Sequence, residues 1–321
     1  MRLADIVEPL KERDGGLPSA RWERGAHIIR QIANDRGVRS LEVPDTFPTA
    51  LADSLRGLGF GVRWIDAPFE PARAFKTADE VEKIRGAIRH TEAAMQYAID
   101  RIADASIGDD GLLHENGAPL TSEQVRFGID SLLLERHCYA YEAIVAGGEQ
   151  GCDPHERGHG PLPAHSPIIL DIFPRDLKTR YHGDMTRTVV RGKASEEAKK
   201  MYRAVADAKA RAEELLKDGA DGWDVHKAVD ETFTSAGFET GQKDGRMQGF
   251  FHGTGHGLGL DVHELPRVSR VHETMLEGHV VTVEPGLYYP GVGGVRIEDD
   301  VLITKDGCEN LCTMESVFEL G

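Results

Sequence analysis

A stripe of apolar side chains between residues 77 and 104 is the clearest pattern in this chain. Its members recur at alternating spacings of three and four residues, which is typical of one face of an amphipathic helix. They are Val81, Ile84, Ile88, Thr91, Met95, Ala98 and Ile102. Thr77 and Glu80 form a capping box that satisfies exposed amides at the start of this predicted helix. A second capping box, Thr121 with Gln124, begins another predicted helix.

The pattern changes to strands after residue 166. Residues 167–173 form a short apolar run, and residues 181–190 alternate well enough to be its hairpin partner. The order then recurs, with helices predicted near 195–217 and 222–237 and strands from about 249 to 304. Both halves run helix, helix, strands, so the sequence predicts an α+β fold.

The first 72 residues are predicted to form a separate, small α/β unit. Its helices and strands alternate at residues 19–36, 41–43, 48–58 and 61–65. Two prolines within four residues, Pro68 and Pro71, then indicate a linker. The sequence therefore predicts two domains, residues 1–72 and 73–321.

Charge and composition exclude several classes of function. The 321 residues carry a formal net charge of −16, which disfavours a nucleic-acid groove, because polyphosphate binding requires concentrated Lys and Arg. No apolar run is long enough to cross a bilayer, and the N-terminal sequence lacks the apolar core of a signal peptide. We therefore expect a cytoplasmic protein without nucleic-acid or membrane partners.

The four cysteines, Cys138, Cys152, Cys308 and Cys312, form no CxxC pair. Four thiols in a chain of this length do not make a disulfide framework, so reduced thiols are expected. Cys152 lies close in sequence to His155, but no third group that would orient a thiol–imidazole pair is evident.

Five residues of the types that bind metal ions lie in five separate local motifs. They are Asp171 in LDIFPRD, Asp184 in HGDMTRT, His256 in HGTGHGLGLDVHE, Glu284 in TVEPG and Glu298 in GGVRIEDD. Four carboxylates and one imidazole are a donor set for two divalent cations that share bridging oxygens. Paired cations about 3.5–4 Å apart are a recurring means of making hydroxide from water at neutral pH. The set predicts a metal-dependent hydrolase.

Each of these residues also has a simpler interpretation. A lone Asp in a strand usually lies at a sheet end, but Asp171 has apolar neighbours, and a buried carboxylate must be paired, hydrogen-bonded or bound to metal. Asp184 and Thr186 point to one face of their strand, so Thr186 can hydrogen-bond a ligating carboxylate. Arg296 and Glu298 share a face in the same way, and a surface ion pair is the alternative there.

Residues 252–263 hold three histidines, His252, His256 and His263, in a glycine-rich segment. The four glycines make a helix costly here, and a glycine-rich extended segment lets the backbone approach a bound group. These three histidines therefore predict a site. The isolated histidines are interpreted as structural or solvated: His27, His90, His114, His226 and His279.

Together, HGTGHGLGLDVHE, TVEPG, GGVRIED and the GDMTRT motif after Asp171 resemble the creatinase and aminopeptidase P family of metallopeptidases, the pita-bread family. The resemblance covers roughly residues 73–321, with the motifs in family order. It implies a catalytic domain in which helices pack on a curved antiparallel sheet. The N-terminal unit is shorter than the usual domain of this family, and the loop between Asp171 and Asp184 is slightly longer than the family pattern.

The resemblance implies a role for each predicted metal ligand. Asp171 would bind one ion, and Asp184 and Glu298 would bridge both. His256 and Glu284 would complete the shell of the other ion, and Glu284 would also move a proton from the bridging water.

Four further residues are implied near the substrate. His155, in CDPHERGHG, would act near the leaving group. His252 and His263 would contact the substrate, and Arg296 would support the bridging Glu298.

The activity that the resemblance implies is a dinuclear metal-dependent exopeptidase, which hydrolyses the N-terminal Xaa-Pro bond of small peptides. The oxygen-rich donor set favours Mn²⁺, with Co²⁺, Zn²⁺ or Fe²⁺ as alternatives, and the resemblance allows a homodimer. Two other functions stay open. One is a different reaction on the same metal site, by a non-proline aminopeptidase or a lyase, and the other is a non-catalytic scaffold protein of the same fold.

Overall fold

The computed structural model describes residues 17–65, 71–140 and 142–321. The chain divides into two compact units, Met1–Pro71 and Ala72–Gly321. The first unit contains the helices and strands predicted for it: α2 (Arg21–Asp35), β1 (Ser40–Val43), α3 (Thr49–Gly57) and β2 (Gly61–Trp64). β1 and β2 pair in parallel, and Leu55 and Phe60 lie in the apolar core of this unit. Most of the predicted linker lies outside the described residues.

The second unit begins with the two predicted helices, α4 (Ala78–Asp104) and α5 (Ser122–Glu135). Both predicted capping boxes are formed. The apolar stripe of α4 is buried from Val81 to Ile102, which confirms the amphipathic pattern. The smaller elements around these helices are a 3₁₀ turn (Pro71–Ala74) and the strands β3 (Ser106–Ile107), β4 (Leu113–Glu115) and β5 (Ala118–Pro119).

A four-stranded sheet packs against these helices, with the order β20-β10-β8-β7. Its strands are β7 (Ile144–Gly147), β8 (Ile168–Ile172), β10 (Met185–Arg191) and β20 (Glu319–Leu320). β8 and β10 are antiparallel, with Thr186 opposite Asp171, so the predicted hairpin is confirmed. The connection between them contains a further short strand that the sequence did not predict, β9 (Arg175–Asp176), which pairs with β6 (Cys138–Tyr139). A 3₁₀ helix (Gly148–Cys152) follows β7.

The second half of this unit repeats the helix, helix, strands order. Its helices are α6 (Glu196–Leu215) and α7 (Gly222–Ser235). They pack on a five-stranded sheet of order β14-β13-β15-β18-β19 and on the hairpin β16–β17. The strands of this sheet and hairpin are β13 (Gly255–Gly257), β14 (Glu264–Val268), β15 (Val280–Val283), β16 (Gly286–Tyr289), β17 (Gly293–Arg296), β18 (Asp299–Ile303) and β19 (Cys308–Asn310). β11 (Gly241–Lys243) and β12 (Arg246–Gln248) pair with each other in a separate two-stranded sheet.

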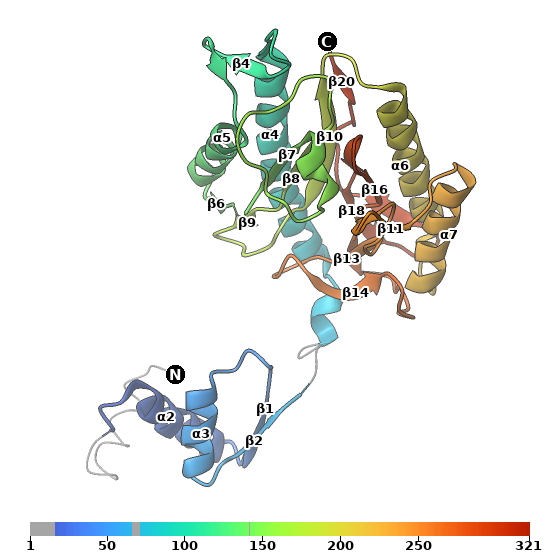
Figure 1. The fold of residues 1–321 in the computed structure, drawn as a ribbon. Coiled ribbons are helices and arrows are strands. Elements are labelled where there is room, and N and C mark those ends of the chain that lie inside the picture. The colour runs from blue at the N-terminus through green and yellow to red at the C-terminus, as the bar shows by residue number, and fades with distance from the viewer. Residues whose placement is uncertain (1–16, 66–70, 141) are drawn as a thin grey trace. The chain divides into compact units, whose positions relative to one another are not determined.

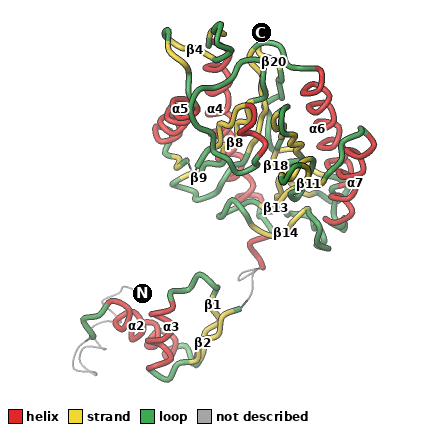
Figure 2. Tube along the Cα trace, in the orientation of Figure 1, coloured by secondary structure: helices red, strands yellow, loops and turns green. Residues whose placement is uncertain are grey.

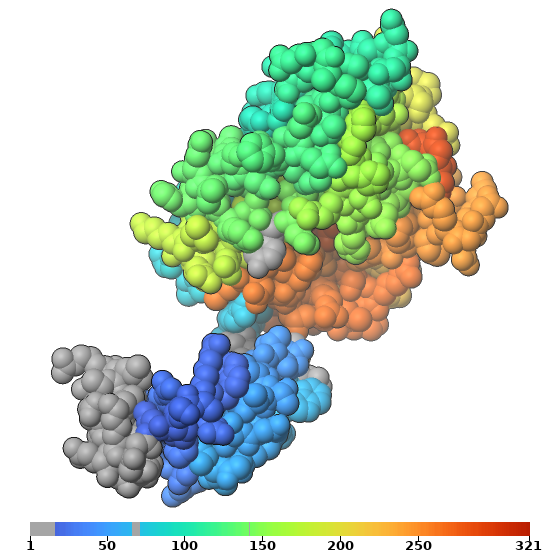
Figure 3. Space-filling view, turned by 60° about the vertical axis from the view of Figure 1, so that its left-hand side comes forward, coloured from blue at the N-terminus to red at the C-terminus, as the bar shows by residue number. Residues whose placement is uncertain are grey.

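The two halves meet along their strands. In Figure 1, α4 and α5 lie to the left of the strands, and α6 and α7 lie to their right; Figure 2 separates the helices from the strands by colour. The green segments of the first half and the orange segments of the second adjoin on the molecular surface (Figure 3). The Glu298 amide donates to the Thr186 carbonyl at 3.0 Å, and the Thr188 hydroxyl donates to the Arg296 carbonyl at 2.9 Å. Strand ends from both halves therefore converge.

Among the described residues, no helix combines the length and the apolar character that crossing a bilayer requires.

Candidate metal centre

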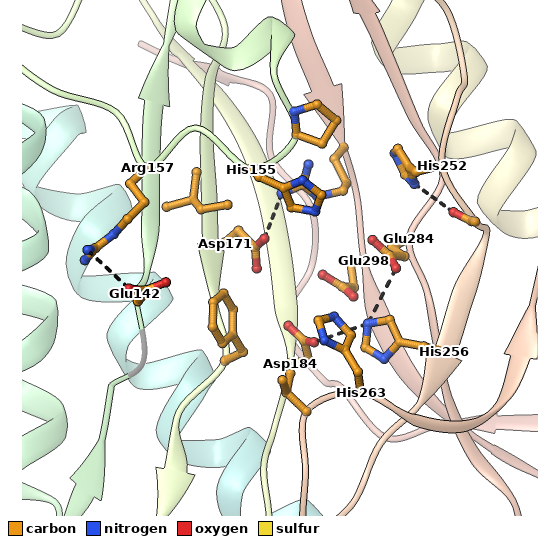
Figure 4. Close-up of a pocket in the computed structure, with 16 residues that line it drawn as sticks. Glu142, His155, Arg157, Asp171, Asp184, His252, His256, His263, Glu284 and Glu298 are labelled. Atoms are coloured by element: carbon orange, nitrogen blue, oxygen red, sulfur yellow. Dashed lines mark hydrogen bonds and ion pairs between the residues drawn. The ribbon is translucent and has the colours of Figure 1, made fainter. Parts of the chain in front are cut away.

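The five predicted metal ligands come together where the strand ends of the two halves meet (Figure 4). Asp171 is in β8, Asp184 precedes β10, His256 is in β13, Glu284 follows β15, and Glu298 lies between β17 and β18. Ligand atoms of Asp184, His256 and Glu298 all lie within 4.8 Å of one another. His256 Nε2 lies 3.5 Å from Glu284 Oε1. Segments far apart in the sequence thus supply one compact set of donors.

Three carboxylates of this set are buried with few partners, and the fourth, Glu284, is partly buried. Asp171 and Asp184 are only 8% and 4% exposed, and the Oδ1 atom of each has no hydrogen-bond partner among the described residues. Burial of a charged oxygen without a partner is costly. Divalent cations bound by these oxygens would offset that cost, so the residues present fit a metal centre.

Burial is the main cause that raises the pKa of three of these carboxylates, and repulsion among them adds to it. Burial raises the pKa of Glu284 to about 8. Burial and then the charges of neighbouring carboxylates raise the pKa of Asp184 and of Glu298 well above their usual values. A cation among these groups would favour their charged forms. The charged forms of these carboxylates therefore need a bound cation to be stable at neutral pH.

Hydrogen bonds orient two of the carboxylates. The Thr186 hydroxyl donates to Glu298 Oε2 at 2.7 Å, as the strand period predicted for a carboxylate of this set. Arg296 Nη2 donates to Asp171 Oδ2 at 2.7 Å, which is a partner that the sequence did not predict. Arg296 also reaches Glu298 through Thr186, whose hydroxyl oxygen accepts from Arg296 Nε at 3.2 Å, so its support of Glu298 stays a prediction.

The His256 ring is arranged as a neutral imidazole whose Nε2 lone pair can bind a metal ion. Its Nδ1 lies 3.2 Å from the Gly257 carbonyl and can donate a hydrogen bond there, which leaves the Nε2 lone pair for another partner. Nε2 faces Asp184 Oδ2 at 3.8 Å and Glu284 Oε1 at 3.5 Å. Burial lowers the pKa of His256 to about 3. A neutral imidazole with one nitrogen fixed by a carbonyl is a common arrangement of metal-binding histidines.

A hydrogen-bonded chain connects the centre to His252. Arg296 Nη1 donates to the Tyr288 hydroxyl at 2.8 Å, so the Tyr288 proton is directed to His252 Nε2 at 2.9 Å. His252 Nδ1 is then the protonated nitrogen and donates to the Gly253 carbonyl at 2.7 Å. Burial lowers the pKa of His252 to about 3. His252 therefore lines the pocket without a free ring N–H to donate.

His155 and His263 lie beside the acidic cluster (Figure 4). The His263 ring meets the His256 ring edge-on, with centroids 4.3 Å apart, and burial lowers the pKa of His263. The His155 amide donates to Asp153 Oδ1 at 2.9 Å, which fixes the backbone of its loop. All nine residues that the sequence singled out line this one pocket.

The sequence did not identify two buried residues next to these nine. The carboxylate of Asp300 is fully buried and accepts from the Asp184 amide at 3.0 Å. Its spacing of two from Glu298 was an available signal, since such residues share a face of extended backbone. Tyr288 had no such signal, because its contacts with His252 and Arg296 are tertiary.

Arg157 and Glu142 lie at the other end of the pocket (Figure 4). Their charged atoms are 3.9 Å apart, and the side chains are 48% and 71% exposed. The lining also includes the apolar residues Ile144 and Phe173. The cavity volume is about 340 Å³, at the lower end of the range of roughly 300–1,000 Å³ for ligand sites. The pocket is thus acidic at one end and carries an exposed cation at the other.

Known proteins resemble this chain in both sequence and structure. The pattern of metallopeptidase family M24 matches residues 82–305. An Xaa-Pro dipeptidase from Pyrococcus furiosus is 32% identical over 262 residues, which cover 78% of this chain and 66% of that protein, just under two thirds of its length. An Xaa-Pro dipeptidase from Pyrococcus horikoshii is 29% identical over 324 residues, which cover 97% of this chain and 83% of that protein.

The crystal structure of an X-Pro aminopeptidase from Thermotoga maritima superposes on this chain with a TM-score of 0.75 and 25% identity, covering 94% of this chain and 80% of that one. This likeness and the family match confirm the predicted α+β pita-bread fold and the predicted family. The relatives indicate a hydrolase of the peptidase class, and the family implies divalent metal ions.

Proposed function

Because this chain belongs to metallopeptidase family M24, we propose that it is an exopeptidase that uses two divalent metal ions to hydrolyse the N-terminal Xaa-Pro bond of short peptides. The observation that carries the proposal is the convergence of three buried carboxylates, one partly buried carboxylate and one neutral histidine on a single pocket. The similarity to proteins named Xaa-Pro dipeptidase and X-Pro aminopeptidase supports the preference for proline.

The predicted ligands would hold the two ions: Asp171, Asp184, His256, Glu284 and Glu298. Mn²⁺ is the preferred choice, because four of the five donors are carboxylates. When bound, the two ions would lower the pKa of a water molecule and polarise the scissile carbonyl. The unpartnered oxygens of Asp171 and Asp184 support this assignment.

Glu284 is the residue that we assign to proton transfer. Its side chain is 19% exposed, whereas Glu298 is 2% exposed, so Glu284 is the more accessible of the two from the pocket. It would accept the proton of the attacking water and pass it to the departing nitrogen. That nitrogen belongs to proline and carries no N–H in the peptide, so a proton must be supplied as it leaves.

His155 and His263 would donate hydrogen bonds to the oxygen that gains negative charge, because both line the pocket beside the acidic cluster. His252 has both ring nitrogens engaged within the protein, so we assign it to shaping the pocket instead.

Arg157 supports a short substrate with a free C-terminal carboxylate. The other Arg in the pocket lining, Arg296, is 3% exposed and already hydrogen-bonded to Asp171 and Tyr288. Arg157 is about half exposed and its nearest acidic partner, Glu142, lies beyond hydrogen-bonding distance. A dipeptide or tripeptide that reaches from the acidic cluster to Arg157 would satisfy both ends of the pocket.

The test is a side-by-side assay of Ala-Pro, Ala-Pro-Ala and Ala-Ala-Ala. The protein is first freed of metal with a chelator and then supplied with Mn²⁺, Co²⁺ or Zn²⁺. We expect cleavage of the two proline peptides, and only with metal. Equal cleavage of Ala-Pro-Ala and Ala-Ala-Ala would contradict the proline preference. No cleavage with any of these metals would favour a lyase or a scaffold protein.

A cytoplasmic location and a homodimer are also part of the proposal. Both rest on the sequence and its resemblance. Cell fractionation tests the first, and light scattering of the purified protein tests the second.

A further inference from the structure

A second cluster of metal-ligand residues lies away from the nine pocket residues. β6 and β9 pair so that Cys138 is directly opposite Asp176, and side chains of such cross-strand partners lie on one face of the pair. His90 of α4 completes the group (Figure 1 shows α4 with β6 and β9). One ligand atom from each of the three residues lies within 4.8 Å of the other two. A helix and a two-stranded ladder thus present nitrogen, sulfur and oxygen to one point.

Each of these side chains has donor capacity that the protein leaves unused. His90 Nδ1 is buried without a hydrogen-bond partner among the described residues. The Cys138 thiol is buried, with a weak contact of 3.7 Å to the Arg136 carbonyl. Asp176 has one oxygen, Oδ1, fixed by two backbone amides, while Oδ2 faces His90 Nε2 at 3.9 Å. No sequence motif connects these three residues, and an isolated histidine such as His90 is typical of a structural histidine.

We propose that His90, Cys138 and Asp176 bind a single divalent cation of the zinc type, separate from the catalytic pair. Zinc accepts thiolate, imidazole and carboxylate ligands together, at about 2.0–2.3 Å in a tetrahedral arrangement. Ligands at those distances lie somewhat closer to one another than 4.8 Å, so a small contraction completes the site. The side chains of His90 and Asp176 are 27% and 17% exposed, which leaves access for the ion and for a water as fourth ligand.

The charges are consistent with such an ion. Burial and the Asp176 charge raise the pKa of the Cys138 thiol to about 11 and outweigh the opposite effect of Arg136, so a bound cation would be needed to favour the thiolate. Burial, followed by the charges of Arg136 and Arg89, lowers the pKa of His90 and keeps the imidazole neutral, as a ligand must be. A divalent ion with one thiolate and one carboxylate forms a neutral unit, which is the least costly form for a partly buried site.

An ion bound at this site would restrain the segment that connects Asp171 to Asp184. β9 belongs to the connection between β8, which carries Asp171, and Asp184. An ion held by His90 and Asp176 would tie this connection to α4. The segment between two predicted catalytic ligands would then be fixed from outside the pocket.

The test uses the sulfur ligand, which distinguishes this site from the catalytic centre. Full-length protein is reduced, freed of metal and titrated with Co²⁺. We expect sulfur-to-cobalt charge-transfer absorption in the near ultraviolet, because the donors of the catalytic centre are oxygen and nitrogen. Added Zn²⁺ should displace Co²⁺ and abolish this absorption.

Variants assign the signal to its residues. Cys138→Ser and His90→Gln should abolish the charge-transfer absorption. Cys308→Ser is the matched thiol control. His114→Gln is the matched imidazole control, because His114 pairs with Asp110 at 3.0 Å in a His–Asp pair outside the three-residue cluster. Both controls should keep the absorption, and so should Asp184→Asn, which alters the catalytic centre alone.

Two results would overturn the proposal. One is a wild-type protein that shows no charge-transfer absorption with excess Co²⁺, and the other is absorption that persists in Cys138→Ser. If Cys138→Ser does not fold, His90→Gln and Asp176→Asn carry the test, because their side chains are partly exposed. Unchanged absorption in both of these variants also overturns it.

Discussion

Glu298 and Asp299 are neighbours in the chain and both are buried, but their surroundings are opposite. Glu298 faces other carboxylates, and burial together with their charges raises its pKa well above the usual value. Burial also acts to raise the pKa of Asp299, but Arg187 and Lys209 outweigh it and hold the pKa below the usual value. Two adjacent residues thus differ: the Glu298 carboxylate faces other negative charges, whereas the Asp299 carboxylate is neutralised by two cations of the protein.

The partners explain this difference. Asp299 lies 2.8 Å from Arg187 and 2.7 Å from Lys209, and it accepts from Asn310 at 3.0 Å. Among the described residues, the Glu298 side chain accepts its hydrogen bond from the neutral Thr186 hydroxyl. A buried carboxylate with cations from its own chain is complete and structural. One that faces further carboxylates needs a cation from outside, which is the property of a metal ligand.

The largest expected effect comes from removing the charge of Glu298. Glu298→Gln keeps the volume but removes a predicted bridging ligand, so bound metal and activity should fall together. Loss of a mere supporting group near a metal costs about 10–100-fold, so kcat/KM should fall by more than about 100-fold. Elemental analysis and hydrolysis of Ala-Pro measure the two quantities. A variant that still binds both ions would contradict the assignment of Glu298 as a metal ligand, and the contrast with Asp299 would then have another cause.

Asp299→Asn tests the other side of the comparison. It leaves Arg187 and Lys209 buried beside a neutral amide, which should lower the free energy of unfolding by about 3–5 kcal/mol, as breaking a buried ion pair does. Urea unfolding of the metal-free protein measures this. Glu298→Gln under the same conditions is the control, and it should unfold at an equal or higher urea concentration because it removes a repulsion. Equal destabilisation by both variants would contradict the difference between the two acids.

The stability of the metal-free protein should depend on pH, because a carboxylate of the metal centre has a raised pKa. Glu284 has a pKa of about 8 in the folded protein and an ordinary value of 4.5. Between these values the folded protein keeps a proton that the unfolded chain has released. Buried histidines such as His252 and His256 act in the opposite direction below their ordinary pKa of 6.5, so stability should fall as the pH rises from 6.5 to 8. Each pKa unit is worth about 1.4 kcal/mol, so the decline over this range should be about 2 kcal/mol.

Urea unfolding at several pH values measures this decline. Glu284→Gln should reduce it, and saturating Mn²⁺ should abolish it in the wild-type protein. Stability that stays flat or rises between pH 6.5 and 8 in the metal-free wild type would show that the pKa of Glu284 is not raised in the folded protein.

The sequence predicted the features whose causes are local. Capping boxes and apolar spacing predicted α4 and α5, and strand alternation predicted the hairpin of β8 and β10. The five predicted ligands each lie in a distinct local motif, which made them visible without a structure. β9 was missed because it is two residues long and owes its pairing to β6, which lies far away in the chain.

The features that the sequence could not predict depend on tertiary contacts. Arg296 was expected to support Glu298, but its closest carboxylate partner is Asp171, on a strand of the other half. Tyr288 joins Arg296 to His252 only after β16 and β17 have paired. Arg157 is two residues from His155, but the sequence does not show that its side chain faces the same pocket.

Arg157 extends the comparison to a cation whose acidic partner, Glu142, is itself exposed and lies 3.9 Å away. Arg157→Met removes the charge and keeps an unbranched side chain. A hydrogen bond to a charged group is worth about 1.5–3 kcal/mol, so KM for Ala-Pro should rise by about 10–100-fold with kcat nearly unchanged. Steady-state kinetics measure both constants.

Two controls separate carboxylate binding from pocket structure. Ala-Pro amide lacks the carboxylate, so its KM should be the same for wild-type protein and Arg157→Met. Glu142→Gln removes the exposed acidic partner of Arg157 and should change KM for Ala-Pro little, because exposed ion pairs contribute little. An equal rise in KM for Ala-Pro and its amide would assign Arg157 to the structure of the pocket.

The smallest expected effect concerns the one neutral donor to Glu298. Thr186→Val keeps the shape of the side chain but removes the hydrogen bond that orients this carboxylate, so the affinity for Mn²⁺ should fall by about tenfold. Calorimetric titration measures it, and Thr186→Ser, which retains a hydroxyl, should recover most of the affinity. Thr188→Val is the matched control, because Thr188 follows on the same strand but bonds only the backbone of Arg296. If both valine variants weaken Mn²⁺ binding equally, strand packing explains the loss, and the bond from Thr186 does not position Glu298.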